Sequence, residues 1–223
     1  MGDDPPFRPA QIFTQLCEVS GLTVIGITGP TGAGKTTVLR VLASLGAVIL
    51  DCDAVYHDLT LSCRPMRAEL AGAFGPDIFG PDGALLRKKL GAVVFDDPRA
   101  LERLNAITHR YVAQAVDQAV EGARREGRPA AAVDAIALIE GGLGSLCDVT
   151  VAVVASEETR VRRIMAREGI GEDYARLRVS AQKPAQYFEE QCDYVLRNDG
   201  DDPAELEARA WTLFDTIINK GDA

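Results

Sequence analysis

The chain has 223 residues and a mass of 23.9 kDa, which is enough for one substantial domain with small additions but not for several independent domains. Hydrophobic residues make up 47% and charged residues 26%, so the composition disfavours disorder and fibrous repeats. The 24 lysines and arginines against 33 aspartates and glutamates give a formal net charge of -9. Because such a chain lacks a broad positive surface, we expect neither nucleic acid nor an anionic membrane as a partner. A local cluster of cations could still hold a small phosphorylated ligand.

The sequence indicates a protein of the cytoplasm. It has no run of about eighteen apolar residues, so no transmembrane helix is predicted, and its N-terminus lacks the apolar core of a signal peptide. The five cysteines are widely spaced and include no C-x-x-C pair. This pattern is typical of reduced thiols rather than of a disulfide framework or a zinc site. We expect a monomer or a small homo-oligomer.

The first elements are a strand, a glycine-rich turn and a helix. Residues 1–22 are predicted to be an N-terminal lead-in, with a helix at about 11–19. Residues 22–28 form an apolar run bounded by glycine, which is typical of a buried parallel strand. Glycines break this run at 29–34, and residues 35–45 have apolar side chains on one face of a helix.

The same alternation continues to the C-terminus. Short apolar runs predict four further strands, at residues 47–50, 130–135, 149–155 and 194–196. Helical patterns are found at residues 100–125, 157–167 and 204–219. Strands separated by helices predict an α/β fold, with a parallel sheet covered by helices on both faces.

Two segments interrupt this rhythm, at residues 58–95 and 168–192. The second is polar and mostly helical in pattern. Excursions from the carboxyl edge of such a sheet commonly form substrate subdomains and lids, so we expect both here.

The sharpest motif is G-P-T-G-A-G-K-T at residues 29–36, which matches the P-loop pattern G-x-x-x-x-G-K-[ST]. Glycines let successive backbone N–H groups turn toward phosphate oxygens, and the helix N-terminus adds its positive dipole end. Lys35 supplies a full charge toward the β- and γ-phosphates, and the Thr36 hydroxyl is placed to bind Mg²⁺. The motif therefore predicts a site for a nucleoside triphosphate. The length of the chain favours a small-molecule kinase.

Two carboxylates follow the second predicted strand, at Asp51 and Asp53. One could help to position Mg²⁺ while the other accepts a proton from an acceptor hydroxyl. The alternative is that they only cap a helix that begins near Ala54. His57, one turn later, could contact substrate or simply lie at the surface.

Taken together, these motifs resemble the dephospho-coenzyme A (dephospho-CoA) kinase family. The resemblance covers about residues 23–200 and rests on the run 25–37, Leu45-Gly-Ala47, Leu50-Asp-Cys-Asp-Ala54, Gly83-Ala-Leu-Leu-Arg87, Val94-Phe95, Leu104-Asn-Ala-Ile-Thr-His109, Glu140, Gly142-Leu143, Arg163 with Arg167, Gln182, Cys192-Asp-Tyr-Val195 and Asn198. One departure is Phe188, at a position where the family commonly has lysine.

The resemblance implies a P-loop NTPase-type three-layer fold, with a five-stranded parallel sheet, a helical substrate subdomain and a lid. The core would comprise residues 23–57, 128–167 and 193–223, the substrate subdomain about 58–127, and the lid about 168–192. The implied reaction is transfer of the γ-phosphoryl group of ATP to the ribose 3′-hydroxyl of dephospho-CoA, the last step of coenzyme A synthesis.

The resemblance also implies roles for single residues. Asp53 would be the base that orients the 3′-hydroxyl, and Asp51 would support it or the metal. Lys35 and, in the lid, Arg167 would complete the catalytic set, while Arg87 and His109 would bind the acceptor. Mg²⁺ would be bound by Thr36. The residues implied for ATP are Pro30, Thr31, Gly32, Ala33, Gly34, Lys35, Thr36, Thr37 and, near the adenine, Asn198.

Helical spacing places Arg160, Arg163 and Arg167 on one face of a predicted helix. Such a stripe could clamp phosphates, because phosphoryl transfer spreads negative charge over oxygens that cations must surround. Alternatively, it could be a solvated face paired with nearby glutamates. Arg178 and Gln182 could likewise face the nucleotide or solvent.

Two other functions stay open at this point. One is a P-loop kinase for another small hydroxyl acceptor, such as a nucleoside or a nucleotide. The other is an ATP-binding regulator without catalysis, although a pure binder has no need of a base such as Asp53.

Overall fold

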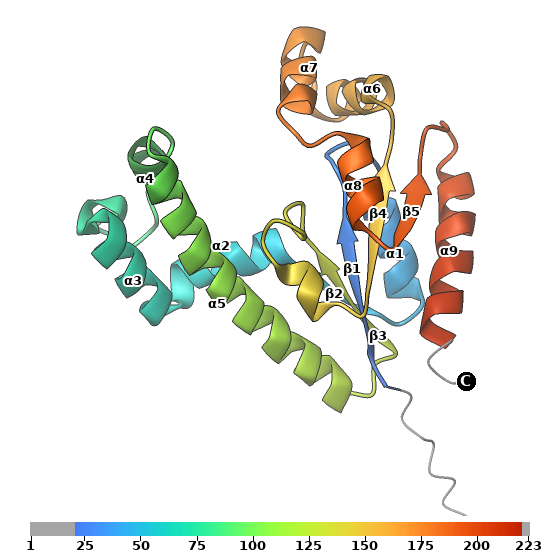
Figure 1. Cartoon of the computed structure of the whole chain (residues 1–223), viewed down its shortest axis with the longest axis horizontal. Coiled ribbons are helices and arrows are strands. Elements are labelled where there is room, and N and C mark those ends of the chain that lie inside the picture. Colours follow the sequence, from blue (N-terminus) through green and yellow to red (C-terminus); the bar gives the residue numbers. More distant parts are fainter. Residues whose placement is uncertain (1–20, 220–223) are drawn as a thin grey trace, which may run out of the picture.

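The computed structural model describes residues 21–219 of the chain. Five parallel strands form one sheet in the order β2-β3-β1-β4-β5 (Figure 1). They are β1 (Thr23–Thr28), β2 (Val48–Asp51), β3 (Ala130–Asp134), β4 (Val149–Val154) and β5 (Tyr194–Arg197). The α/β fold, with a five-stranded parallel sheet between helices, is therefore confirmed.

Within residues 21–219, eight α-helices and two short 3₁₀ turns connect the strands, and a ninth α-helix follows the last strand. The helices are α1 (Lys35–Ser44), α2 (Cys52–Ser62), α3 (Arg64–Phe74), α4 (Arg87–Val94), α5 (Pro98–Arg125), α6 (Glu157–Glu168), α7 (Glu172–Ser180), α8 (Ala185–Gln191) and α9 (Pro203–Asn219). The 3₁₀ turns are η1 (Pro76–Ile78) and η2 (Leu143–Leu146). The helix expected at about 11–19 lies outside the described residues.

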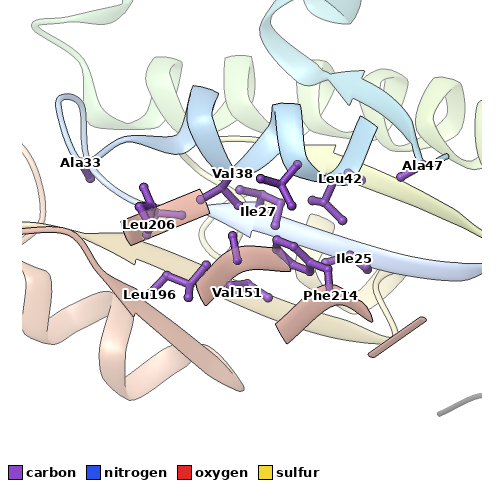
Figure 2. Packing of buried hydrophobic residues seen from close by; sticks show 14 of the residues in the cluster. Ile25, Ile27, Ala33, Val38, Leu42, Ala47, Val151, Leu196, Leu206 and Phe214 are labelled. Carbon is purple, nitrogen blue, oxygen red and sulfur yellow. The ribbon is translucent and has the colours of Figure 1, made fainter. Parts of the chain in front are cut away.

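Helices cover both faces of the sheet, so the side chains on both faces are apolar. On one face, Ile25 and Ile27 of β1 pack with Leu42 of α1 and Phe214 of α9, and all four side chains are fully buried (Figure 2). On the other face, Val24 packs in a separate cluster with the second half of α5. Alternate residues of one strand thus serve opposite layers, which explains why β1 is a continuous apolar run.

Strand register brings two carboxylates to one edge of the sheet. Asp51, the last residue of β2, lies opposite Asp134, the last residue of β3. On the neighbouring strand β1, Ile27 lies opposite Asp134. The loop after β1 therefore leaves the sheet next to Asp134, and Asp51 lies one strand further along the same edge.

The segment between β2 and β3 forms a helical unit at one side of the sheet (Figure 1). Met66, Leu70 and Ile78 are buried there with Leu90 of α4 and Ile107 of α5. Helix α5 is continuous over 28 residues and also packs on the sheet through its second half. It therefore belongs to both units, and the subdomain boundaries at 58–127 stay a prediction.

The segment expected to be a lid consists of two parts. Helix α7 packs on α6, where Val161, Ile164, Ala175 and Val179 are buried together. Helix α8 packs against β4 through Phe188, whose side chain is 2% exposed. Position 188 is thus a core position in this chain, so the aromatic residue there has a packing role.

None of the helices within residues 21–219 is both long and apolar enough to cross a bilayer. Over the same range the cysteines form no disulfide; they are Cys52, Cys63, Cys147 and Cys192.

Candidate active site

The loop from Gly29 to Gly34 joins β1 to α1 and lies pressed against its surroundings. Gly29, Gly32 and Gly34 have φ values of 133°, 85° and 110°, which disfavour other residues. A Cβ atom on Gly29 would lie 2.1 Å from the carbonyl oxygen of Val153, and one on Gly34 would lie 2.3 Å from Nδ2 of Asn198. Glycine is therefore required at both positions by space as well as by conformation.

Lys35 folds back over this loop. Its Nζ donates a hydrogen bond of 2.7 Å to the carbonyl oxygen of Gly29. Burial lowers the pKa of the Lys35 amine below its ordinary 10.5, and the carboxylates of Asp134 and Asp53 partly offset this. The cation is thus held in place before it meets any phosphate.

The N-terminus of α1 completes an anion site. Gly34 is its N-cap and offers no side-chain cap, and the first turn holds no acidic residue. The first backbone N–H groups of α1 are therefore left for a ligand, and the helix dipole favours a negative one.

A cavity of about 440 Å³ opens beside these groups. Its lining is mostly P-loop and cationic: Pro30, Thr31, Gly32, Gly34, Lys35, Thr36, Asp134, Ile136, Arg163, Arg167 and Arg178. Ala33, Thr37 and Asn198, which were also expected to bind ATP, are not part of that lining. Asn198 is buried, and its Nδ2 donates a hydrogen bond of 2.7 Å to the Ala33 carbonyl, so its amide supports the loop. Its contact with adenine stays a prediction.

Asp134 is a site residue that the sequence analysis missed. Its Oδ1 is buried and has no hydrogen-bond partner among the described residues. Burial raises the pKa of this carboxyl, and the charge of Lys35 opposes that rise. The available signal was its position at the end of an apolar strand, which is also where Asp51 stands.

The two acids of the Asp51–Asp53 pair have different surroundings. Oδ1 of Asp51 accepts hydrogen bonds from the backbone N–H groups of Asp53 (2.9 Å) and Ala54 (3.0 Å). Asp51 therefore caps α2, which is the alternative role predicted for this residue. The helix begins at Cys52 and not near Ala54 as expected. Asp53 instead lines a second cavity.

This second cavity has a volume of about 260 Å³ and lies between the sheet edge and the helical unit. It is lined by Cys52, Asp53, Tyr56, Leu104, Asn105, Thr108, His109, Val112, Ala135, Ile136, Ala137, Gly141 and Leu143. Ile136 is part of both linings, so the two cavities are adjacent. Burial raises the pKa of the Cys52 thiol to about 12, which leaves it an inert part of the wall.

The predicted acceptor residues lie at this second cavity or near it. His109 is part of the lining. Arg87 is not, but its Nη2 lies 3.2 Å from Nδ1 of His57 on α2, the helix that supplies Asp53 and Tyr56 to the lining. Their roles toward a substrate stay predictions.

The arginines of α6 do not act as one stripe. Arg160 is 1% exposed, which excludes a solvated role for it. Arg163 donates hydrogen bonds to the carbonyl oxygens of Asn198 (2.9 Å) and Gly200 (2.7 Å). Arg167 and Arg178 line the P-loop cavity, and both pair with Glu168. Arg167 therefore does pair with a glutamate, as the alternative interpretation of these arginines predicted, but it also lines the cavity.

The chain has close relatives of known name and structure. The sequence model of the family described as dephospho-CoA kinase matches residues 23–203. A dephospho-CoA kinase of Geobacter sulfurreducens is 38% identical over 188 residues, which cover 84% of this chain and 95% of the relative. A Thermus thermophilus protein of known crystal structure has a TM-score of 0.72 and 31% identity, over 88% of this chain and 98% of its own. A dephospho-CoA kinase from Campylobacter jejuni has a TM-score of 0.64 and 20% identity, over 90% and 98%, a likeness that shows the fold alone.

Proposed function

The chain belongs to the dephospho-CoA kinase family, and we propose that it transfers the γ-phosphoryl group of ATP to the ribose 3′-hydroxyl of dephospho-CoA. The products are coenzyme A and ADP, and the reaction is the final step of coenzyme A biosynthesis. The observation that carries the assignment of residues is that two adjacent cavities share Ile136 in their linings. One cavity has the chemistry of a phosphate site, and the other has a carboxylate where an acceptor hydroxyl would enter.

The first cavity would bind the triphosphate of ATP. Lys35, the open N-terminus of α1, and the arginines 163, 167 and 178 place positive charge around it. These groups neutralise the charge that develops on the equatorial oxygens during transfer, so they stabilise the transition state more than the ground state. Because Lys35 is already oriented by Gly29, little reorganisation is needed when ATP binds.

The residues beside the P-loop also fit a bound Mg²⁺. Among residues 21–219 no cluster of three or more metal-binding side chains occurs, so the protein would supply few direct ligands. Thr36 lines the cavity, and the buried, unpartnered Oδ1 of Asp134 lies on the same wall. Mg²⁺ typically keeps several waters and is held by phosphates and one or two protein oxygens, which matches this set. When bound, it would neutralise charge on the β- and γ-phosphates.

Asp53 would act at the acceptor. It lies on the second cavity and interacts electrostatically with Lys35 of the first. A carboxylate there would accept the proton of the 3′-hydroxyl as that oxygen attacks phosphorus. Asp51 would contribute indirectly, because its cap fixes the first turn of α2, on which Asp53 stands. His109 and Arg87 would bind the remainder of the acceptor.

The test is ADP release from Mg-ATP, measured with dephospho-CoA, adenosine, AMP, shikimate or no acceptor, with mass analysis of the products. We expect release to depend on dephospho-CoA and to yield a product one phosphate heavier. Release with another acceptor would favour the alternative kinase. Tight ATP binding without release for any acceptor would favour the silent regulator.

We further propose that the protein is cytoplasmic, as its free thiols and its use of ATP suggest, and that it is a monomer or a small homo-oligomer. Light scattering of the purified chain measures the oligomeric state.

A further inference from the structure

We propose that Gln182 is a positioning residue that locks the segment after α7 onto the apex of the P-loop, so that the shape of the ATP site depends on this contact. This proposal depends on the proposed function in one respect: it assumes that the P-loop cavity is the site that binds ATP. Gln182 lies 151 residues from its partner Thr31 in the sequence.

The carboxamide of Gln182 uses both of its ends on Thr31. Its Oε1 accepts a hydrogen bond of 3.1 Å from the Thr31 backbone N–H. Its Nε2 donates one of 2.8 Å to the Thr31 hydroxyl. A pair of bonds to one residue fixes orientation as well as distance, because the amide can satisfy both only in one plane.

A buried arginine closes the network. Nε of Arg160 donates to the Thr31 carbonyl (3.0 Å), and its Nη2 donates to Oε1 of Gln182 (2.6 Å). Arg160 is 1% exposed, and a Cβ atom on Gly32 would lie 3.1 Å from the Arg160 carbonyl, so the loop rests directly on it. A buried charge of this kind is costly unless its hydrogen bonds are satisfied, so losing Gln182 leaves Arg160 short of an acceptor.

The network commits all three polar groups of Thr31. Its N–H, carbonyl and hydroxyl are bound by Gln182 and Arg160, so its N–H is not directed at a phosphate. Thr31 nevertheless lines the ATP cavity, together with Arg178 of α7. We therefore infer that Thr31 does not contact phosphate and instead attaches the P-loop to Gln182. Through this attachment, Gln182 fixes the position of α7, which carries Arg178, relative to the P-loop.

Coupling of this kind is reciprocal. If the Gln182 contact favours the P-loop shape that binds ATP, bound ATP must favour the contact. ATP should then protect the backbone of residues 181–184 from hydrogen exchange in the wild type, and this protection should be weaker without the Gln182 amide.

The test uses three variants of the full chain: Gln182→Met, Thr31→Val and the double variant. Methionine keeps the length of the side chain and removes its polar groups, whereas valine removes only the threonine hydroxyl. Gln186→Met is the matched control, because within residues 21–219 the only hydrogen bond of the Gln186 amide is to Glu190 on the exposed face of α8. The readouts are the Kd for Mg-ATP by calorimetry, the KM for each substrate, kcat, and hydrogen exchange with and without ATP.

We expect Gln182→Met to raise the Kd and KM for ATP about tenfold, as the loss of one to two hydrogen bonds predicts. We expect Thr31→Val to raise them about threefold. The KM for dephospho-CoA should change far less in both variants. The double variant should be no worse than Gln182→Met, because the hydroxyl has no partner once the amide is gone.

Three results would overturn the proposal: a Gln182→Met protein that binds ATP like Gln186→Met, additive effects in the double variant, or lower stability with an unchanged Kd for ATP. If Gln182→Met fails to fold, Thr31→Val decides the matter alone, since an unchanged Kd for ATP in that variant contradicts the coupling. A wild-type chain that binds ATP but does not phosphorylate dephospho-CoA would overturn the proposed function and leave this contact intact.

Discussion

The Nζ atom of Lys35 lies 2.7 Å from the carbonyl oxygen of Gly29, six residues earlier in the same loop. The bond holds the amine above the loop that faces the phosphate cavity, while burial lowers its pKa and two carboxylates oppose that effect. The site therefore holds a partly desolvated cation in the position where negative charge would develop.

The first prediction concerns removal of that cation. Lys35→Met keeps most of the aliphatic stem and deletes the charge, so we expect kcat to fall at least about 100-fold, as for other single electrostatic groups in transition-state sites. Stability should be unchanged or higher, because a partly desolvated charge is removed. Steady-state ADP release and urea unfolding measure the two effects. Turnover near that of the wild type would refute the role of Lys35.

The second prediction is a pH dependence. Because the folded-state pKa of Lys35 is below 10.5, the folded protein releases this proton at a lower pH than the unfolded chain does. Between those two pKa values the unfolded state binds more protons, so stability should rise with pH. Lys35→Met lacks the group, so the wild type should gain stability relative to the variant as pH increases across this window. An opposite slope in that difference would contradict the assigned direction.

The third prediction separates Asp53 from Asp51. Asp53→Asn should lower kcat by about 10² to 10⁴-fold, the usual range for a general base, with the Kd for ATP nearly unchanged. Asp51→Asn should keep the cap of α2, since asparagine caps as well as aspartate, whereas Asp51→Ala should cost about 1 kcal/mol of stability. Equal losses of kcat and ATP affinity in Asp53→Asn would mean that this residue has a structural role.

The P-loop and the sheet could be predicted because their signals are local. An apolar strand, three glycines with positive φ and a lysine follow one another within residues 23–35. The residues alone did not separate the roles of Asp51 and Asp53, because a carboxylate near a helix N-terminus suits both capping and catalysis; only the resemblance assigned them different roles. Only the backbone geometry shows that Asp51 is the cap.

What escaped prediction depends on contacts between distant segments. Asp134 carried only the weak signal of an acid at a strand end, and its importance follows from its register beside Ile27 and Asp51. Gln182 was expected to face either nucleotide or solvent, and it instead binds Thr31, 151 residues away. Such pairings are set by the order of strands in the sheet, which no local pattern encodes.

The fourth prediction tests the division of the segment 168–192. Phe188→Ala should destabilise the protein by about 3–5 kcal/mol, because it empties a buried site against β4. Phe95→Ala is the matched control: Phe95 is 79% exposed, so its loss should change stability by no more than about 0.5 kcal/mol. Chemical unfolding of both variants is the measurement. A small effect for Phe188→Ala would mean that α8 belongs to a detachable lid.

The two adjacent cavities that share Ile136 are proposed to bring the γ-phosphoryl group of ATP to the ribose 3′-oxygen of dephospho-CoA. Phosphorus NMR of the product formed from Mg-ATP and dephospho-CoA tests this most directly, because it locates the new phosphate on the acceptor. The account predicts a single new 3′-phosphomonoester with wild-type protein and none with Lys35→Met over the same time. A phosphate on another atom, or ADP formed together with free phosphate and unchanged dephospho-CoA, would contradict it.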